Sequence, residues 1–262
     1  MRALYTAATG TAAQELNVQV ISNNIANMRT TGYKKQRAAF QDLIYDHVRR
    51  VGAQASDQGT ILPVGVDIGG GVKTVGTPRL MTQGTLSATG NDLDIAIRGE
   101  GFFKIQMPDG TYAYTRDGSF QMDAQGRIVT AEGNPVQPTI TIPQNSSGLT
   151  INTQGQVSVI PQGSTTPTVL GQITLTRFVN QAGLLPVGDN LYTETPASGT
   201  PQDGLPGTDG AGDLLQSNLE QSNVDSVSEI TNLIAAQRAY EMNSKVITAA
   251  DQMLQTTSNL MR

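Results

Sequence analysis

The chain contains no glycine or proline after Gly212, and this feature limits the possible fold more than any other. Residues 222–260 therefore predict one long helix, and Ser222 and Asp225 form a capping-box start where negative charge is favoured. Small or apolar residues recur along it at alternating spacings of three and four, as in a coiled-coil seam: Leu233, Ala236, Tyr240, Asn243, Ile247, Ala250, Leu254, Thr257 and Met261. A helix of roughly 55 Å, at 1.5 Å per residue, exceeds one compact domain and needs a partner.

The other end of the chain predicts that partner. No proline precedes Pro63, and a second seam with the same spacing contains Leu4, Ala7, Thr11, Gln14, Val18, Ile21, Ile25 and Met28. This helix should end between Asn27 and Thr31, with a turn at Gly32. Both seams are rich in Ala, Thr, Asn and Gln, so at about 25 cal/mol per Å² their pairing is marginal in a monomer. Further copies would complete the burial, whereas an ordinary antiparallel hairpin of surface helices is the alternative.

All twelve prolines lie between Pro63 and Pro206, so the middle of the chain is rich in turns. Alternation of apolar and polar residues predicts half-buried strands at 92–97, 101–107, 111–115 and 172–176. The fold class is therefore α+β, in which N- and C-terminal helices pair as a coiled coil and an antiparallel, hairpin-rich β domain is inserted between them. The expected division is a terminal helical domain at 1–33 with 222–262, a connecting segment at 34–71 with 195–221, and a β domain at 72–194.

The connecting segment combines two predicted features. Phe40, Leu43, Ile44 and either His47 or Val48 have helical spacing, which predicts a short amphipathic segment. The polar, glycine-containing stretch 52–71 predicts an extended hairpin-like insert without a core of its own. We expect the apolar part of the insert to extend along a neighbouring subunit.

The sequence offers little catalytic chemistry. There is no cysteine, and His47 is the sole histidine, which indicates a surface or packing residue. The spacing of Asp92 and Asp94 indicates a solvated strand face rather than an acid–base or calcium pair. Phe102 and Phe103 predict the centre of a small β core rather than a ligand platform. We expect no cofactor, no metal and no enzymatic activity.

Charge and hydropathy exclude other functions. Residues 1–50 carry seven Lys or Arg against three Asp or Glu, but no DNA-binding motif accompanies them, so no nucleic-acid partner is expected. No apolar run approaches the roughly 20 residues that span a bilayer. The N-terminus also lacks the apolar core of a cleavable secretion signal, so we expect either a cytosolic protein or export by an unusual route.

Three ordered blocks of the sequence resemble the bacterial flagellar rod and hook axial proteins. The blocks are NMRTTGYK at 27–34, IRGEGFF at 97–103 continuing to YTRDGSF at 114–120, and SNVD at 222–225 followed by AQRAYE at 236–241. The length and the insert at 59–71 are most similar to members of the distal rod. A proximal rod or hook-type axial subunit is the alternative, although hook members usually carry an additional outer domain.

The resemblance implies a structural subunit that assembles helically into the tubular drive shaft and transmits torque from motor to hook. Implied partners are further copies of the chain, proximal rod proteins, the hook protein, the surrounding P and L ring proteins, and the flagellar type III export apparatus during secretion. The implied location is the flagellar basal body, from periplasm to outer membrane, reached without a cleaved signal peptide. The expected assembly interface contains Leu4, Val18, Ile21, Ile25, Asn27, Thr30, Gly32, Tyr33, Ile61, Leu62, Pro63, Leu233, Ala236, Tyr240, Ile247, Ala250 and Leu254.

A function of a different class is a periplasmic enzyme or glycan-binding module in which the β domain holds a ligand and the helices only oligomerise it. The chain contains one histidine and no cysteine or tryptophan, which argues against this function.

Overall fold

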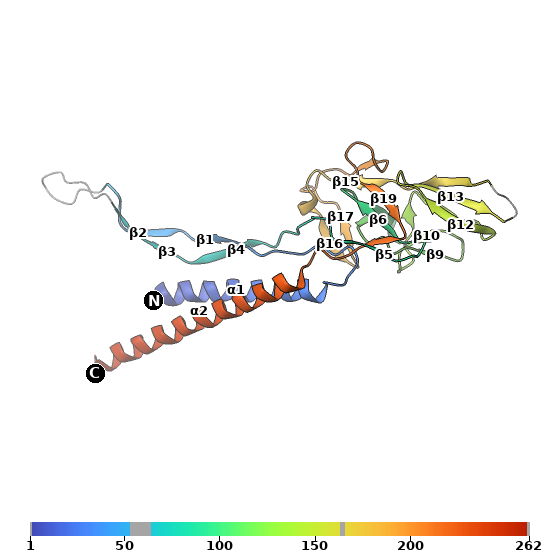
Figure 1. Ribbon diagram of the computed structural model, residues 1–262. Helices are drawn as coiled ribbons and strands as arrows, with labels where there is room; N and C mark the ends of the chain where they lie inside the picture. Colours follow the sequence, from blue (N-terminus) through green and yellow to red (C-terminus); the bar gives the residue numbers. More distant parts are fainter. Residues whose placement is uncertain (1, 53–63, 163–165, 261–262) are drawn as a thin grey trace. The chain divides into compact units, whose positions relative to one another are not determined.

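The computed structural model describes residues 2–52, 64–162 and 166–260 (Figure 1). They form two compact units. The helical unit comprises Met1–Ile25, Gln36–Pro78 and Asp225–Arg262, and the β unit comprises Ala26–Lys35 and Arg79–Val224. The α+β class is confirmed, because an N-terminal and a C-terminal helix pack together and the middle of the chain is rich in antiparallel strands.

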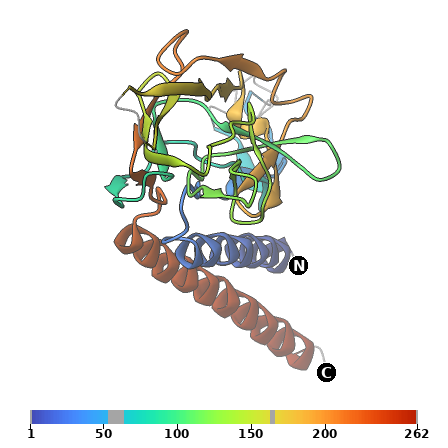
Figure 2. The ribbon, with the colours of Figure 1, turned by 90° about the vertical axis from the view of Figure 1, so that its right-hand side faces the viewer.

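The helical unit contains the two long helices, α1 (Arg2–Ala26) and α2 (Ser226–Leu260). They run antiparallel, since Asn24 donates to Glu229 (3.2 Å) while Gly10 lies against the side chain of Asn243. Figures 1 and 2 show the helices closest where α1 ends and α2 begins, and diverging toward their free ends. With this register Ala250 is level with Ala3, so the last turns of α2 extend past the described start of α1.

The start of α2 differs from the prediction. The helix begins at Ser226, and the carboxylate of Asp225 accepts a hydrogen bond from Val227 N (3.4 Å), which is the role of an N-cap. Ser222 instead accepts from Val224 N within the preceding turn (3.3 Å). The prediction that Ser222 caps the helix is therefore wrong, because Asn223 is held in the β unit and cannot join the helix.

The other part of the helical unit is a ribbon of two antiparallel strand pairs. Its strands are β1 (Ala39–Asp42), β2 (Tyr45–Arg49), β3 (Val66–Gly69) and β4 (Val72–Gly76), with β1 paired to β4 and β2 to β3. The helical spacing over 40–48 does not produce a helix, because these residues form backbone hydrogen bonds with the returning strands. The ribbon contacts α1, since Val72 N donates to Thr9 Oγ1 (3.4 Å).

The β unit contains one five-stranded sheet in the order β11-β7-β8-β17-β16. Its strands are β11 (Val136–Gln137), β7 (Phe103–Gln106), β8 (Tyr112–Thr115), β17 (Leu191–Thr193) and β16 (Leu185–Gly188). A three-stranded sheet contains β12 (Ser146–Ile151), β13 (Gln156–Pro161) and β14 (Thr168–Gln172) in that order. The predicted strands at 101–107 and 111–115 are confirmed as β7 and β8.

Four strand pairs complete this unit. They are β9 (Gln121–Met122) with β10 (Ile128–Val129), β15 (Leu175–Arg177) with β18 (Gln202–Gly204), β6 (Ile95–Arg98) with β19 (Asp213–Gln216), and β5 (Leu86–Ala88) with β20 (Asn218–Glu220). A short 3₁₀ helix, η1, spans Gln181–Gly183. The strands β19 and β20, near the end of the unit, therefore pair with β6 and β5, near its start. These two pairs complete the unit.

The core of the β unit confirms the interpretation of the Phe102-Phe103 pair. Phe103 lies in the main cluster, where its ring meets that of Phe120 edge to face at 5.0 Å between centroids. Phe102 lies in a second cluster with Tyr114, Phe178 and Tyr192. The side chains of these two neighbours therefore point to opposite sides of the chain, and each belongs to a different cluster.

The interpretation of Asp94 as a solvated strand residue is wrong. Its side chain is buried and accepts hydrogen bonds from Thr89 Oγ1 (2.6 Å) and Asn91 Nδ2 (3.0 Å). Asp94 lies directly before β6 and forms an isolated antiparallel bridge with Ser119, and its side chain stabilises the turn that precedes it. Asp92 is exposed, as expected.

Candidate assembly surfaces

The N-terminal sequence block NMRTTGYK forms a tight turn that belongs to the β unit. Thr30 Oγ1 donates to Asn27 Oδ1 (3.2 Å), and Gly32 N donates to Glu220 O (2.8 Å). The ring of Tyr33 is buried beneath the guanidinium of Arg79, 5.8 Å from its centroid. In one subunit, therefore, these predicted interface residues already have partners within their own chain.

Gly32 occupies a position that only glycine fits. Its φ is +68°, and a Cβ there would lie 2.8 Å from the backbone carbon of Arg116 and from Asp117 N. Left-handed backbone favours glycine, and a clash with backbone cannot be relieved by a rotamer change.

We expect Gly32→Ala to lower the free energy of unfolding of the β unit by more than about 2 kcal/mol, because strain and collision act together. The matched control is Gly110→Ala, where φ is +84° and nothing lies within 4 Å of the added Cβ. That variant should lose only about 1 kcal/mol. Denaturant unfolding followed by far-UV circular dichroism measures both losses, and equal losses would contradict the role of the close approach.

Next to Gly32 lies a buried cluster of three charged residues. Glu220 is fully buried, and its Oε1 accepts from Lys34 Nζ (2.6 Å) and Gly84 N (2.9 Å). Arg116 Nε lies 3.3 Å from the other carboxylate oxygen. Two cations thus share one carboxylate in the interior.

The environment of the cluster lowers the pKa values of both cations. Burial, followed by the neighbouring Arg116 guanidinium, lowers the pKa of Lys34, although Glu220 acts in the opposite direction. Burial also lowers the pKa of Arg116. Lys34 additionally donates to Thr82 O (2.8 Å), and backbone oxygens satisfy the guanidinium of Arg116.

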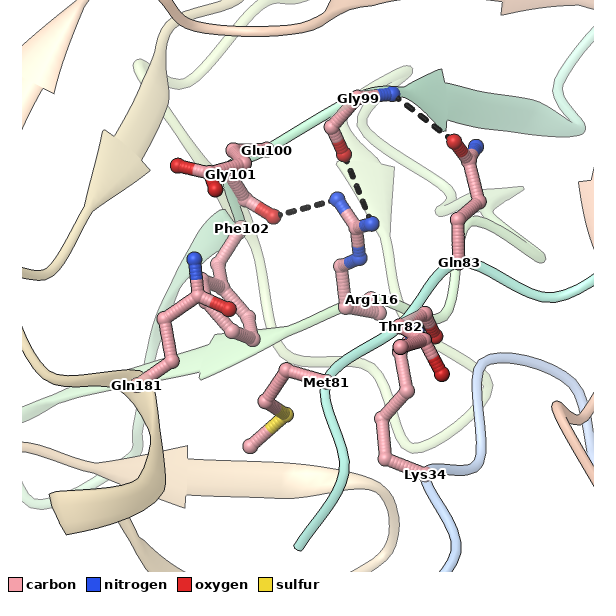
Figure 3. Close-up of a pocket in the computed structure, with 10 residues that line it drawn as sticks. All are labelled: Lys34, Met81, Thr82, Gln83, Gly99, Glu100, Gly101, Phe102, Arg116 and Gln181. Carbon is pink, nitrogen blue, oxygen red and sulfur yellow. Dashed lines mark hydrogen bonds between the residues drawn. The ribbon is translucent and has the colours of Figure 1, made fainter.

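A cavity of about 230 Å³ lies beside Lys34 and Arg116 of this cluster. Figure 3 shows the residues that line it. Arg116 donates to Gly99 O and Gly101 O, both at 2.8 Å, and the Gln83 side chain accepts from Gly99 N (3.1 Å). These bonds fix the backbone of the IRGEGFF block. Because the polar groups around the cavity bind one another, their arrangement stabilises the unit and does not by itself define a ligand site.

The C-terminal block SNVD binds the N-terminal block directly. Asn223 N donates to Tyr33 O of that block (3.4 Å), and Asn223 Oδ1 accepts from Lys35 N just after it (2.8 Å). The Nδ2 of Asn223 donates to Leu80 O (2.8 Å) and Thr82 O (3.0 Å). Sequence reasoning missed Lys34, Arg116, Glu220 and Asn223 as contact residues. Their occurrence in or beside the recognised sequence blocks was the available signal, although Glu220 lies just outside its block.

Among the seam residues of the expected assembly interface, Ile21, Ala236 and Ala250 are buried within the helical unit. Leu4, Val18, Ile25, Leu233 and Ile247 are half-buried, and Tyr240 and Leu254 are exposed. The contacts between the two helices involve Gly10 and Asn24 of α1, which lie outside its predicted seam, and Asn243 of α2, which lies on the α2 seam.

A second stripe of α2 remains exposed, and we call it the outer stripe. It contains Val227, Ile230, Ile234, Met242, Val246 and Met253, whose exposed fractions lie between 47% and 72%. The ribbon also exposes Ile44, Val48, Val64, Val66 and Ile68. Ile61, Leu62 and Pro63 lie outside the described residues.

Within the described residues, neither helix is long and apolar enough to cross a membrane. The same residues contain no group of three or more His, Cys, Asp or Glu side chains that is able to hold a metal ion.

Comparison with known families matches all three parts of the chain. Residues 4–34 match the flagella basal body rod protein family, residues 96–159 the flagellar hook protein FlgE/F/G D1 domain, and residues 215–260 the flagellar basal body rod FlgEFG protein C-terminal family. These ranges contain all three sequence blocks.

Individual relatives cover nearly the whole chain. The flagellar basal-body rod protein FlgG of Caulobacter vibrioides is 56% identical, with 99% of each chain covered. FlgG of Buchnera aphidicola from Acyrthosiphon pisum is 50% identical over 98% of each chain. FlgF of Caulobacter vibrioides is 36% identical over 94% of this chain and 91% of its own.

The chain therefore belongs to the family of bacterial flagellar rod and hook proteins. Within this family it is most like FlgG, and it is a structural subunit of the basal-body rod of the distal type. The resemblance stated from the sequence is confirmed.

Proposed function

We propose that copies of this chain assemble helically into the tubular distal rod and transmit torque from motor to hook without catalysing a reaction. In this proposal the terminal helices pair as a coiled coil and pack against those of neighbouring copies. The connecting segment at 34–71 with 195–221 and the β domain at 72–194 surround them. Proximal rod proteins and the hook protein adjoin the ends, and the P and L ring proteins surround the shaft. The subunit reaches the periplasm through the flagellar type III export apparatus.

The observation that carries the proposal is the outer stripe of α2. The stripe lies on a different side of α2 from the seam that faces α1. In a single subunit, the six apolar side chains of the stripe and the end of α2 are therefore exposed to water. Burying the exposed halves of these side chains would contribute roughly 6 kcal/mol, which is comparable to the lower estimates for the cost of association. Stable association then requires several contacts per subunit, as a helical polymer supplies.

The experiment is sedimentation of the purified subunit over a range of concentrations, with Met242→Asp as the test variant. Wild type should form polymers above a critical concentration. Met242→Asp should raise that concentration at least tenfold, since it places a charge in the outer stripe and 1.4 kcal/mol corresponds to tenfold.

The matched control is Ser244→Asp, an exposed residue two positions along the same helix and therefore on a different face. It should assemble like wild type. A wild-type protein that stays monomeric and gains thermal stability from a glycan would instead support a ligand-binding module.

A further inference from the structure

The sequence of the β unit contains a long stretch without any charge. No Asp, Glu, Lys or Arg occurs from Gly133 to Thr176. The chain as a whole is 15% charged, already below the usual 25%, and at that content about six charges would be expected in a stretch of this length. The stretch also contains no Phe, Tyr or Trp.

The structure places this stretch mainly in the sheet β12-β13-β14. One face of the sheet packs on the main core through Ile151, Val157 and Val159, which are buried. The other face carries a cross-strand row in which Thr150 pairs with Ser158 and Ser158 with Val169. We call this second face, together with exposed Ile160, the neutral face.

One edge strand of this sheet, β14, contains no charged residue. In the sheet order, β14 is an edge strand, and its Val169 is 53% exposed. Natural proteins usually protect edge strands with charged side chains, inward-pointing charges or covering elements, because bare edges associate with other chains. The strand β14 contains no charged residue. This composition is typical of an edge strand that another protein covers.

The chemistry of the neutral face limits the partner. Nucleic acids and anionic lipids require cations, which the stretch lacks. Sugar rings bind most often by stacking on aromatic side chains, which it also lacks. Depletion of charge around a few apolar residues is instead typical of the centre of protein–protein interfaces.

We propose that the neutral face binds a second copy of this chain in the polymer, which rests on the helical assembly proposed above. Each copy carries a net charge of −5, so surfaces that meet in a homopolymer bring like charges together. A face without charges avoids both this repulsion and the desolvation of buried ions. Neighbouring copies are also the proteins present at the highest local concentration.

The test is Val169→Glu, with Val187→Glu as the matched control. Val187 is a valine of similar exposure, 56%, on the edge strand β16 of the other sheet. Val169→Glu should raise the critical concentration for polymer formation at least tenfold, while Val187→Glu and the uncharged Val169→Gln should assemble like wild type. Normal assembly of Val169→Glu, or equal loss in both glutamate variants, would overturn the proposal.

Cysteine labelling separates a buried contact from a folding defect. Because the chain contains no cysteine, Val169→Cys introduces a single thiol. A maleimide should label it fully in subunits and at least tenfold more slowly in polymers. Equal labelling in both states would overturn the inference. Cells carrying Val169→Glu that build normal rods but rotate them poorly would also overturn it, because that result would assign the face to a surrounding protein. Failure of wild type to polymerise would instead refute the proposed function itself.

Discussion

Glu220→Gln should lower the free energy of unfolding of the β unit by about 3–5 kcal/mol, a large part of the 5–15 kcal/mol that stabilises a typical domain. The substitution keeps the shape of the side chain but removes the negative charge that Lys34 and Arg116 share. Two buried cations would then lack a counterion. Denaturant unfolding monitored by far-UV circular dichroism measures the loss.

Two variants calibrate this result. Asp213→Asn makes the same chemical change in the exposed pair between Arg98 and Asp213, and should cost less than about 1 kcal/mol. Lys34→Met leaves one cation facing one anion and should therefore cost less than Glu220→Gln. If Glu220→Gln and Asp213→Asn were equally stable, the buried cluster would not hold the unit together.

Ile247→Asp should abolish polymer formation while the β unit stays folded. Ile247 is half-buried on the seam of α2, and an aspartate there places an unpaired charge where the helices pack. A loss of about 3 kcal/mol per contact weakens association by more than 100-fold. The β unit ends at Val224, so it should survive limited proteolysis in the variant.

Sedimentation and electron microscopy of Ile247→Asp supply the readout. Thr248→Asp, at the next and exposed position, is the control and should form polymers. Polymers of normal length from Ile247→Asp would show that this part of the seam is not needed for assembly.

The helices could be predicted because their signals are local. The absence of proline from both segments, the absence of glycine from the second, and the spacing of small residues predict α1 and α2 within each segment. The ribbon could not be predicted in the same way, since Phe40, Leu43 and Ile44 fit helical spacing and only pairing with β4 and β3 makes this stretch extended. Strands depend on partners, and partners are not visible in a short window.

The buried charges were the least predictable part of the molecule. Lys34 and Glu220 are 186 residues apart, and in the sequence Lys34 is simply one member of a basic N-terminal region. Nothing local distinguishes a lysine that is buried beside a carboxylate from one on the surface. Only the tertiary pairing of the first and last segments of the β unit identifies it.

The closure of the β unit by its last residues affects the order in which the protein folds. Strands β19 and β20, Glu220 and Asn223 all arrive late in the chain, yet they complete sheets and charge pairs that start before residue 100. A chain that leaves a narrow channel with its amino end first cannot form these contacts until most of its length has emerged. In the export route proposed above, the high sequence separation of the closing contacts would keep the emerging polypeptide loosely structured during transit, and folding of the unit would be completed only after residue 223 had passed.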